Sequence, residues 1–349
     1  MLDCVEKLDW LSPNLKQSQT ADLETEHRSP RAEKGTLTMI GRADIEAAYQ
    51  RILPYIRCTP VMSLDADALG LGYPITLKLE HLQATGSFKL RGAFNNLLTQ
   101  TLSEAGVVAT SGGNHGAGVA YAATALGVPS TIYVPAAIAA EVKLRRMRGF
   151  GAEVVAVPGH VGDAALECQA HAARTGALEI HPFDSDATLA GQGTIGLELS
   201  SQAEIDTLLV SVGGGGLIGG ILSHYQDDLR VIAVETELTA SMAPSRDQGK
   251  QISITPSGIS ASGLGASAIG DCGWAAAQKW LDGHAVVSDA DTFEAQKLLW
   301  EAARIIVEPS AATALAALTS GAYVPEKDER VAVLLCGGNA EPDWFINEA

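Results

Sequence analysis

A single lysine, Lys89, stands in a setting that suits covalent chemistry. It follows a Gly-Ser turn in the segment Thr85–Ala93 (TGSFKLRGA) and opens an amphipathic stretch. A neutral lysine amine attacks an aldehyde to give a Schiff base, and the start of a helix disfavours the charged ammonium. Most lysines are solvated surface charges. The strand–loop–helix junction nevertheless predicts a reactive amine at Lys89.

A glycine-rich loop, Ser111–Gly116 (SGGNHG), separates an apolar strand-like run from a helical pattern. Ligands of open α/β sheets bind at such carboxyl ends of strands. The glycines leave backbone N–H groups free for an anion, and Asn114 offers both a donor and an acceptor. The loop therefore predicts a binding site, with an ordinary turn capped by Ser or Asn as the alternative.

Two further loops end strands in the same way. Gly213–Gly216 lies between the apolar run Leu208–Val212 and the helical pattern Leu217–His224. Four glycines that open a helix form a good phosphate cradle, although they could also serve close packing. The third loop is Leu335–Asn339 (LCGGN), in which Cys336 would ordinarily be a small buried hydrophobic residue.

The second loop also supports a different function. Gly214–Gly219 satisfies the GxGxxG pattern, and Glu235 ends the next strand, about where a ribose-binding acid belongs. An NAD-dependent dehydrogenase is therefore the alternative from this region. That alternative leaves Lys89 and the Asn114 loop unexplained.

The elements that must position these loops alternate along the chain. Such alternation is typical of βαβ units in a parallel sheet, and the continuous apolar strands indicate helices on both faces. The predicted strands are Ile75–Leu79, Val107–Thr110, Thr131–Val134, Val154–Val157, Leu208–Val212, Val231–Val234 and Val331–Leu335. The predicted helices include one opening at Asp44–Tyr49, and Gly116–Leu126, Val161–Arg174 and Thr292–Arg304.

Composition narrows the class of protein. The 349 residues are 46% hydrophobic, which indicates a globular chain. The formal charge of −17 argues against nucleic acid and anionic membranes as partners. Five scattered cysteines without a CxxC pair, no apolar run of membrane-spanning length and no signal peptide favour the cytoplasm. Residues 1–42 are polar and predict a flexible extension, with Met39 as an alternative start.

Together these segments resemble the fold type II family of pyridoxal-phosphate enzymes, and within it the branch of threonine/serine dehydratases and serine racemases. The resemblance runs from Asp44 to Asn339 and is carried by Lys78–Lys89, Ser111–Gly116, Ala190–Thr194, Gly213–Gly216 and Cys336–Asn339. It implies an α/β fold like the tryptophan synthase β subunit, with two open, twisted, mostly parallel sheets flanked by helices. It also implies a large pyridoxal-phosphate domain over 43–105 and 184–349, and a small α/β domain over 106–183.

The resemblance assigns roles to individual residues. Lys89 would be the Schiff-base lysine and catalytic base, and Glu308 would lie at the active-site mouth. The expected cofactor ligands are Gly213, Gly214, Gly215 and Gly216 on the phosphate, Asn114 on the 3-hydroxyl, Phe88 against the ring and Cys336 at the pyridine nitrogen. The expected ligands of the substrate carboxylate are Ser111, Gly113, Asn114 and His115.

Three departures from the branch refine the expectation. Racemases carry a second serine where this chain has Gly112, so one-sided elimination is favoured. Cys336 replaces the usual serine or threonine; a thiol is a weak donor and would leave the ring nitrogen largely unprotonated, or could tune the site through oxidation. Glu235 fits the first ligand of a divalent cation, but Ser241 stands where a second acid belongs, so the cation is in doubt.

The predicted function is a cytoplasmic pyridoxal-phosphate-dependent ammonia-lyase that converts a β-hydroxy-α-amino acid to a 2-oxo acid and ammonia. L-Threonine and L-serine are the default substrates, and hydroxyaspartate and phenylserine are specialised alternatives. An amino-acid racemase is the nearest rival, and a non-catalytic relative is disfavoured because Lys89 is present. The resemblance also implies a homodimer or homotetramer.

Overall fold

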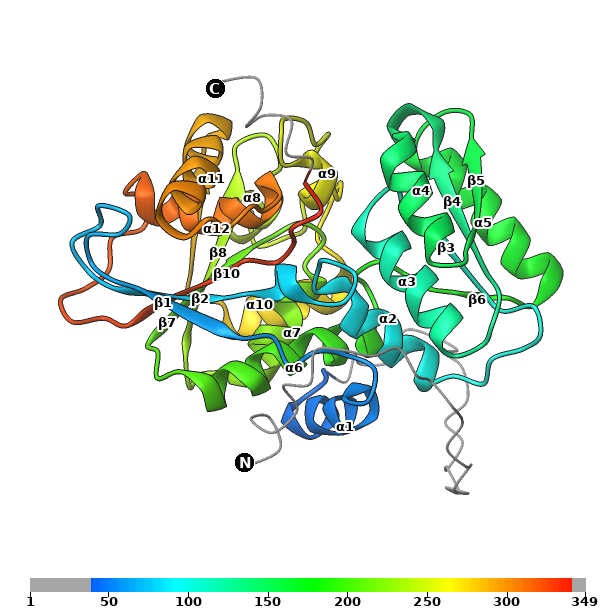
Figure 1. Ribbon diagram of the computed structural model, residues 1–349, viewed down its shortest axis with the longest axis horizontal. Helices are drawn as coiled ribbons and strands as arrows, with labels where there is room; N and C mark the ends of the chain where they lie inside the picture. The colour runs from blue at the N-terminus through cyan, green and yellow to red at the C-terminus, as the bar shows by residue number, and fades with distance from the viewer. Residues whose placement is uncertain (1–38, 341–349) are drawn as a thin grey trace. The chain divides into compact units, whose positions relative to one another are not determined.

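The computed structural model describes residues 39–340 (Figure 1). Most of the predicted extension, residues 1–38, therefore lies outside the described residues. Helix α1 (Arg42–Ile52) confirms the helix predicted to open near Asp44. Among residues 39–340, no helix combines the length and the apolar character needed to cross a membrane.

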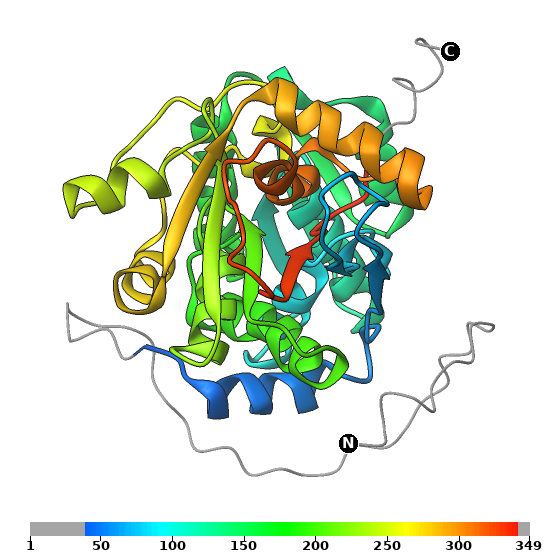
Figure 2. The same cartoon turned by 90° about the vertical axis from the view of Figure 1, so that its left-hand side faces the viewer.

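The larger sheet has six strands in the order β1-β2-β10-β7-β8-β9. Only β1 and β2 pair antiparallel, and the other neighbours pair parallel, as the direction of the arrows in Figure 2 shows. The strands are β1 (Val61–Leu64), β2 (Ile75–Lys78), β7 (Thr207–Ser211), β8 (Arg230–Thr236), β9 (Gly283–Val287) and β10 (Val331–Leu334).

Helices cover both faces of this sheet. In Figure 1, α11 and α12 lie above the strands, whereas α6 and α7 lie below them. All five residues of β7 are buried, as expected for a strand covered on both sides. The helices of this part are α6 (Asp186–Gln202), α7 (Gly216–Tyr225), α8 (Met242–Gln248), α9 (Ala261–Leu264), α10 (Asp271–Trp280), α11 (Asp289–Ala303) and α12 (Pro309–Thr319).

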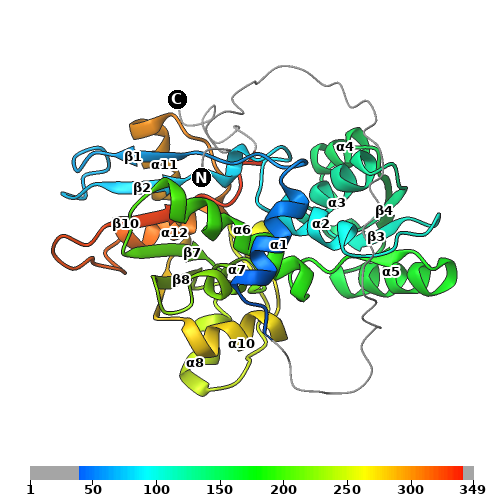
Figure 3. The same cartoon turned by 90° about the horizontal axis from the view of Figure 1, so that it is seen from below.

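The smaller sheet has four parallel strands in the order β5-β4-β3-β6. Helix α5 packs on one face, and α3 and α4 pack on the other (Figure 3). Alternate β3 residues serve the two faces, since Val107 and Ala109 join the core of α3 and α4 while Val108 joins that of α5. The elements are β3 (Val107–Thr110), α3 (Asn114–Ala125), β4 (Ser130–Pro135), η2 (Ala136–Ile138), α4 (Glu141–Gly149), β5 (Glu153–Val157), α5 (Val161–Thr175) and β6 (Leu178–Glu179).

The predicted fold, with two mostly parallel sheets flanked by helices, is confirmed. All seven predicted strands are present, and their bounds shift by no more than two residues. The sequence pattern did not indicate β1, β6 and β9, all of which are edge strands with exposed positions. The four strands of the smaller sheet fall within 106–183; the domain division itself stays a prediction.

Helix α2 (Lys89–Leu98) packs closely against two other helices. A Cβ on Gly118 of α3 would lie 3.3 Å from the backbone of Lys89. A Cβ on Gly191 of α6 would lie 2.7 Å from the Cα of Gly92. A Cβ at Gly191 would clash with the backbone and one at Gly118 would be a tight contact, so these glycines allow α2 to pack closely between α3 and α6.

A buried ionic cluster anchors the same helix. Arg91 Nη2 donates to Glu80 Oε1 at 2.7 Å, and Arg91 Nη1 donates to Glu198 Oε1 at 2.8 Å. Lys78 Nζ donates to the other oxygen of Glu198 at 2.7 Å. Burial alone would raise the pKa of Glu80, but Arg91 and Lys78 hold it below its ordinary value. The cluster fixes α2 two residues from Lys89.

Candidate active site

Lys89 is the first residue of α2, at the junction predicted from the sequence. Its Nζ donates to the carbonyl oxygen of Pro182 at 2.7 Å and lies 5.2 Å from the centre of the Phe88 ring. Burial lowers the pKa of the amine from 10.5 to about 8. A much larger fraction of this amine is therefore neutral near neutral pH than for an ordinary lysine.

The loop Gly213–Gly216 joins β7 to the N-terminus of α7. Its glycines are required by packing, because a Cβ on Gly214 would lie 2.4 Å from the Phe183 ring and one on Gly216 would lie 2.7 Å from the Phe183 carbonyl oxygen. None of the four amides donates a hydrogen bond to another residue of the described chain. Free amides at a helix start form an anion site, and Phe183 links this loop to Pro182, the partner of Lys89.

The loop Ser111–Gly116 likewise leads from β3 into α3. Ser111 Oγ accepts a hydrogen bond from the Gly113 amide at 3.1 Å. Within residues 39–340, the amides of Asn114, His115 and Gly116 make no hydrogen bond. These three amides, at the start of α3, are suited to a carboxylate.

The His115 ring serves the fold rather than this anion site. Its Nε2 donates to the carbonyl oxygen of Ile180 at 2.9 Å. Burial, with Lys89 adding to the effect, lowers the pKa of His115 to about 3, so the ring is neutral. Of His115, only the backbone amide is therefore available to bind the predicted substrate carboxylate.

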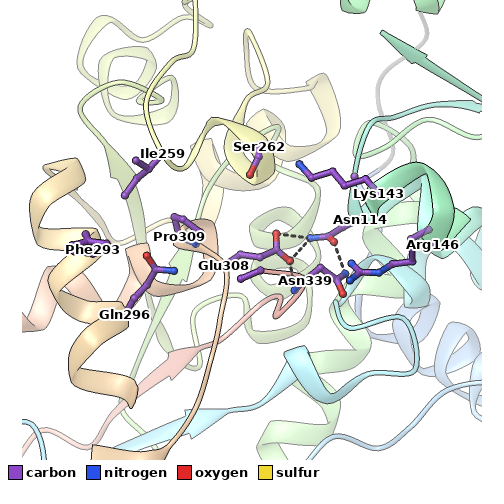
Figure 4. Close-up of a pocket in the computed structure, with 13 residues that line it drawn as sticks. Asn114, Lys143, Arg146, Ile259, Ser262, Phe293, Gln296, Glu308, Pro309 and Asn339 are labelled. Atoms are coloured by element: carbon purple, nitrogen blue, oxygen red, sulfur yellow. Dashed lines mark hydrogen bonds between the residues drawn. The ribbon is translucent and has the colours of Figure 1, made fainter. Parts of the chain in front are cut away.

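Asn114, Glu308 and Asn339 form one hydrogen-bonded group (Figure 4). Asn114 Nδ2 donates to both carboxylate oxygens of Glu308 at 2.9 Å. The Asn339 amide donates to Glu308 Oε1 at 2.9 Å, and its Nδ2 donates to Asn114 Oδ1 at 2.6 Å. Glu308, predicted at the mouth, thus joins the two loops. Asn339 ends the Cys336–Asn339 segment that carries part of the family resemblance, but no pattern in the sequence indicates a role for its side chain.

Cys336 follows β10 and is buried. Its Sγ lies 3.8 Å from the carbonyl oxygen of Ser310, to which the thiol donates. Burial, and then the nearby Glu308 carboxylate, raise the pKa of the thiol far above its ordinary value. Cys336 is therefore a neutral thiol, as the expected contact with an uncharged ring nitrogen requires.

A cavity of about 380 Å³ opens beside the Asn114 group (Figure 4). Lys143 and Arg146 of α4 line it, opposite Phe293, Gln296 and Pro309. Sequence reasoning missed the two cations, because charged residues on an amphipathic helix ordinarily face solvent.

Glu235 is fully buried in β8 and caps α8. Its carboxylate accepts hydrogen bonds from the backbone amides of Ser241, Met242 and Ala243, each at 2.8 Å. These contacts occupy the oxygens that a ribose or a cation would need. Among residues 39–340, no group of three or more His, Cys, Asp or Glu residues is arranged to hold a metal ion.

The residues around Lys89 fit a phosphorylated aldehyde cofactor. The glycine loop supplies free amides for a phosphate, and the Phe88 ring lies beside the amine. The buried Ser87 Oγ and Thr85 Oγ1, from the same segment, have no hydrogen-bond partner within the described residues. Buried polar atoms ordinarily have partners, so this segment has hydrogen-bonding capacity to offer a bound group.

Comparison with known proteins identifies the family. The model of the family "Pyridoxal-phosphate dependent enzyme" matches residues 52–337. The chain is 34% identical over 320 residues to the L-threonine ammonia-lyase of Thermotoga maritima, which covers 89% of this chain and 79% of that protein. The structure of maize serine racemase has a TM-score of 0.83 and 32% identity, covering 89% of this chain and 97% of that one. The crystal structure of T.th. threonine deaminase has a TM-score of 0.81 and 35% identity, covering 86% and 99%.

The half-buried lysine, the two free-amide loops and a family match over most of the chain therefore agree: this protein belongs to the pyridoxal-phosphate dependent enzymes.

Proposed function

We propose that this protein is a pyridoxal-phosphate-dependent ammonia-lyase that dehydrates a β-hydroxy-α-amino acid, with L-threonine and L-serine as the default substrates. The observation that carries the proposal is the Lys89 amine, whose pKa is lowered to about 8 by burial. A base with a pKa near the working pH is effective in proton transfer. The threonine ammonia-lyase and threonine deaminase relatives support the same reaction.

The chain's own residues divide the work of the reaction. The amides of Gly213–Gly216 would hold the cofactor phosphate, with Phe88 beside the ring and the neutral Cys336 thiol at its nitrogen. When bound, pyridoxal phosphate supplies an electron sink that stabilises negative charge at the substrate α-carbon. Lys89 would then take the α-proton, and the β-hydroxyl would leave as water. Hydrolysis of the released enamine gives the 2-oxo acid and ammonia.

The two loops that meet at Asn114 would orient the substrate. The free amides of Asn114, His115 and Gly116, with Ser111 Oγ beside them, would bind the α-carboxylate. Glu308 holds Asn114 in place by two hydrogen bonds. Asn114 would thereby keep one position beside the cofactor hydroxyl.

Gly112 supports elimination over racemisation. A racemase by the two-base route needs a side chain that delivers a proton opposite the lysine. At Gly112, a Cβ would lie 2.8 Å from Cδ1 of Ile138, so a serine there would have to displace this side chain. Proton transfer by Lys89 alone favours a lyase.

We further propose that turnover needs no divalent cation at Glu235, because both oxygens of this buried carboxylate already accept hydrogen bonds from backbone amides. A homodimer or homotetramer in the cytoplasm remains the expected state of assembly and location. Light scattering of the purified protein would measure the assembly.

The experiment is 2-oxo acid release from L-threonine and L-serine by the cofactor-loaded protein, with and without a chelator. Release that persists in the chelator is the expected result. Lys89→Ala should abolish both the release and the visible absorbance of the bound cofactor. Turnover that survives in Lys89→Ala would overturn the proposed base, and loss of α-hydrogen to solvent without 2-oxo acid would instead identify a racemase.

A further inference from the structure

Helix α4 presents two cations to the cavity. Lys143 and Arg146 are three residues apart and so share one face of the helix. Both are half-buried and line the cavity; the Arg146 guanidinium lies beside Asn114 and Asn339, whereas the Lys143 ammonium extends toward Ser262 (Figure 4). Arg148, on another face of α4, is exposed and pairs with Glu141 at 3.3 Å. Lys143 and Arg146 of α4 therefore face the cavity, whereas Arg148 does not.

Neither cavity cation has a carboxylate partner in the described part of the chain. Glu308 is the one carboxylate among the described residues that line the cavity. It is only 7% exposed and already accepts hydrogen bonds from Asn114 and Asn339. Two positive charges thus face the cavity in a chain whose formal charge is −17. Half-buried cations without a counter-ion favour binding of an anion.

The α-carboxylate of an amino acid does not need these two residues. In the proposed function, the free amides of Asn114, His115 and Gly116 hold that group. The methyl group of threonine would offer Lys143 and Arg146 nothing to bind. A guanidinium matches a carboxylate with two parallel hydrogen bonds, and an ammonium adds a point charge.

We infer that the substrate carries a second carboxylate on its β-carbon, as 3-hydroxyaspartate does, and that Arg146 and Lys143 bind it; this inference rests on the proposed dehydratase function. Loss of the α-proton and the β-hydroxyl releases one water. Hydrolysis of the resulting enamine consumes one water and releases ammonia, so the net products are oxaloacetate and ammonia. The cavity of about 380 Å³, which Gly113 and Asn114 of the proposed α-carboxylate loop also line, has room for the second carboxylate of a four-carbon diacid.

The first test compares kcat/KM for 3-hydroxyaspartate, as both diastereomers, with kcat/KM for L-serine. The wild-type enzyme should prefer one hydroxyaspartate diastereomer. Arg146→Ala should lower the hydroxyaspartate-to-serine ratio by about 10- to 100-fold, the size expected for losing charge-assisted hydrogen bonds, and Lys143→Ala should lower it in the same direction. Arg148→Ala, on the same helix, is the matched control and should leave the ratio unchanged.

A ratio that neither cavity variant changes would overturn the inference. A preference for phenylserine over hydroxyaspartate would overturn it as well, and would instead assign specificity to the apolar wall at Phe293 and Pro309.

Binding of succinate, measured by calorimetry on the cofactor-loaded protein, separates this inference from the proposed function. Succinate should bind at least about ten times more weakly to Arg146→Ala than to wild type, and acetate and sulfate serve as controls for simple charge. If the enzyme dehydrates L-serine but Arg146→Ala binds succinate as well as wild type does, the carboxylate subsite is refuted and the proposed function stands. If succinate binding depends on Arg146 but no substrate yields a 2-oxo acid, the proposed function is refuted and the subsite stands.

Discussion

At the scale of single residues, Lys89 shows how a surrounding fold changes the chemistry of an ordinary side chain. The amine is enclosed by Phe88, Pro182 and the neutral Cys336 thiol. Burial disfavours the ammonium form, and no carboxylate forms an ion pair with it among the described residues. A larger neutral fraction of this amine is therefore present before any cofactor binds.

The lowered pKa of Lys89 predicts how chemical labelling of its amine depends on pH. In the protein without cofactor, acylation of Lys89 by acetic anhydride should rise with pH through about 8, because only the neutral amine reacts. The rise for an ordinary lysine occurs near 10.5. Mass spectrometry of the labelled peptides would measure both rates, with the exposed Lys250 as internal reference. A midpoint near 10.5 for Lys89 would contradict the effect of burial.

Some residues of this site could be predicted from the sequence and others could not. Lys89 and the glycine loops were predictable because turn-forming residues mark strand ends. The contact of Asn114 with Glu308 was not, because these residues are separated by most of the chain and their pairing depends on how the loops fold. Lys143 and Arg146 were missed for a different reason, since their charges are usual on a helix and only the packing of α4 turns them inward.

At the scale of elements, the loop from β7 to α7 is shaped by what it packs against. Gly216 lies against the backbone of Phe183, and Phe183 follows the residue that accepts the Lys89 hydrogen bond. A larger residue in this loop would therefore disturb both the proposed phosphate-binding loop and the lysine.

Gly216→Ala should weaken binding of pyridoxal phosphate by at least about tenfold, since its Cβ would lie 2.7 Å from a backbone oxygen. Titration of the protein with the cofactor, followed by absorbance, would measure the change. Gly162→Ala is the matched control, because a Cβ at this position of α5 meets nothing within 4 Å. Equal affinities in the two variants would show that the loop has room to adapt.

The ionic cluster beneath α2 gives a second prediction at this scale. Glu198→Ala would leave Lys78 and Arg91 buried without this partner and should lower the free energy of unfolding by about 3–5 kcal/mol. Glu204→Ala removes an exposed partner of Arg330 and should cost less than about 1 kcal/mol. Urea denaturation would compare the two variants, and similar losses would mean that the cluster does not anchor α2.

At the scale of the whole molecule, buried histidines couple folding to acidity. Burial lowers the pKa of His115 to about 3 and that of His224 to about 4, from 6.5. The folded pKa lies below the unfolded one, so between about pH 4 and 6.5 the unfolded chain binds more protons. Stability from these groups is complete above about pH 6.5 and falls as the pH falls.

His224→Asn should therefore make the free energy of unfolding less dependent on pH. The wild type should lose about 2 kcal/mol between pH 8 and pH 5 that this variant does not lose. Denaturant titrations at the two pH values would measure the difference. His284→Asn, at an exposed position of β9, is the control. Identical pH dependence in wild type and His224→Asn would exclude His224 as a source of acid sensitivity.

The strand order of the larger sheet has a consequence for how the protein is made. Residues 331–334 form β10, yet β10 lies in the interior of the sheet, between β2 and β7. Ribosomes synthesise a chain from its N-terminus, so β2 and β7 emerge long before the strand that joins them. Until then each presents an unpaired edge, the kind of surface that recruits other chains. Protection of the nascent protein must therefore last until β10, and with it Cys336 and Asn339 of the site, has left the ribosome.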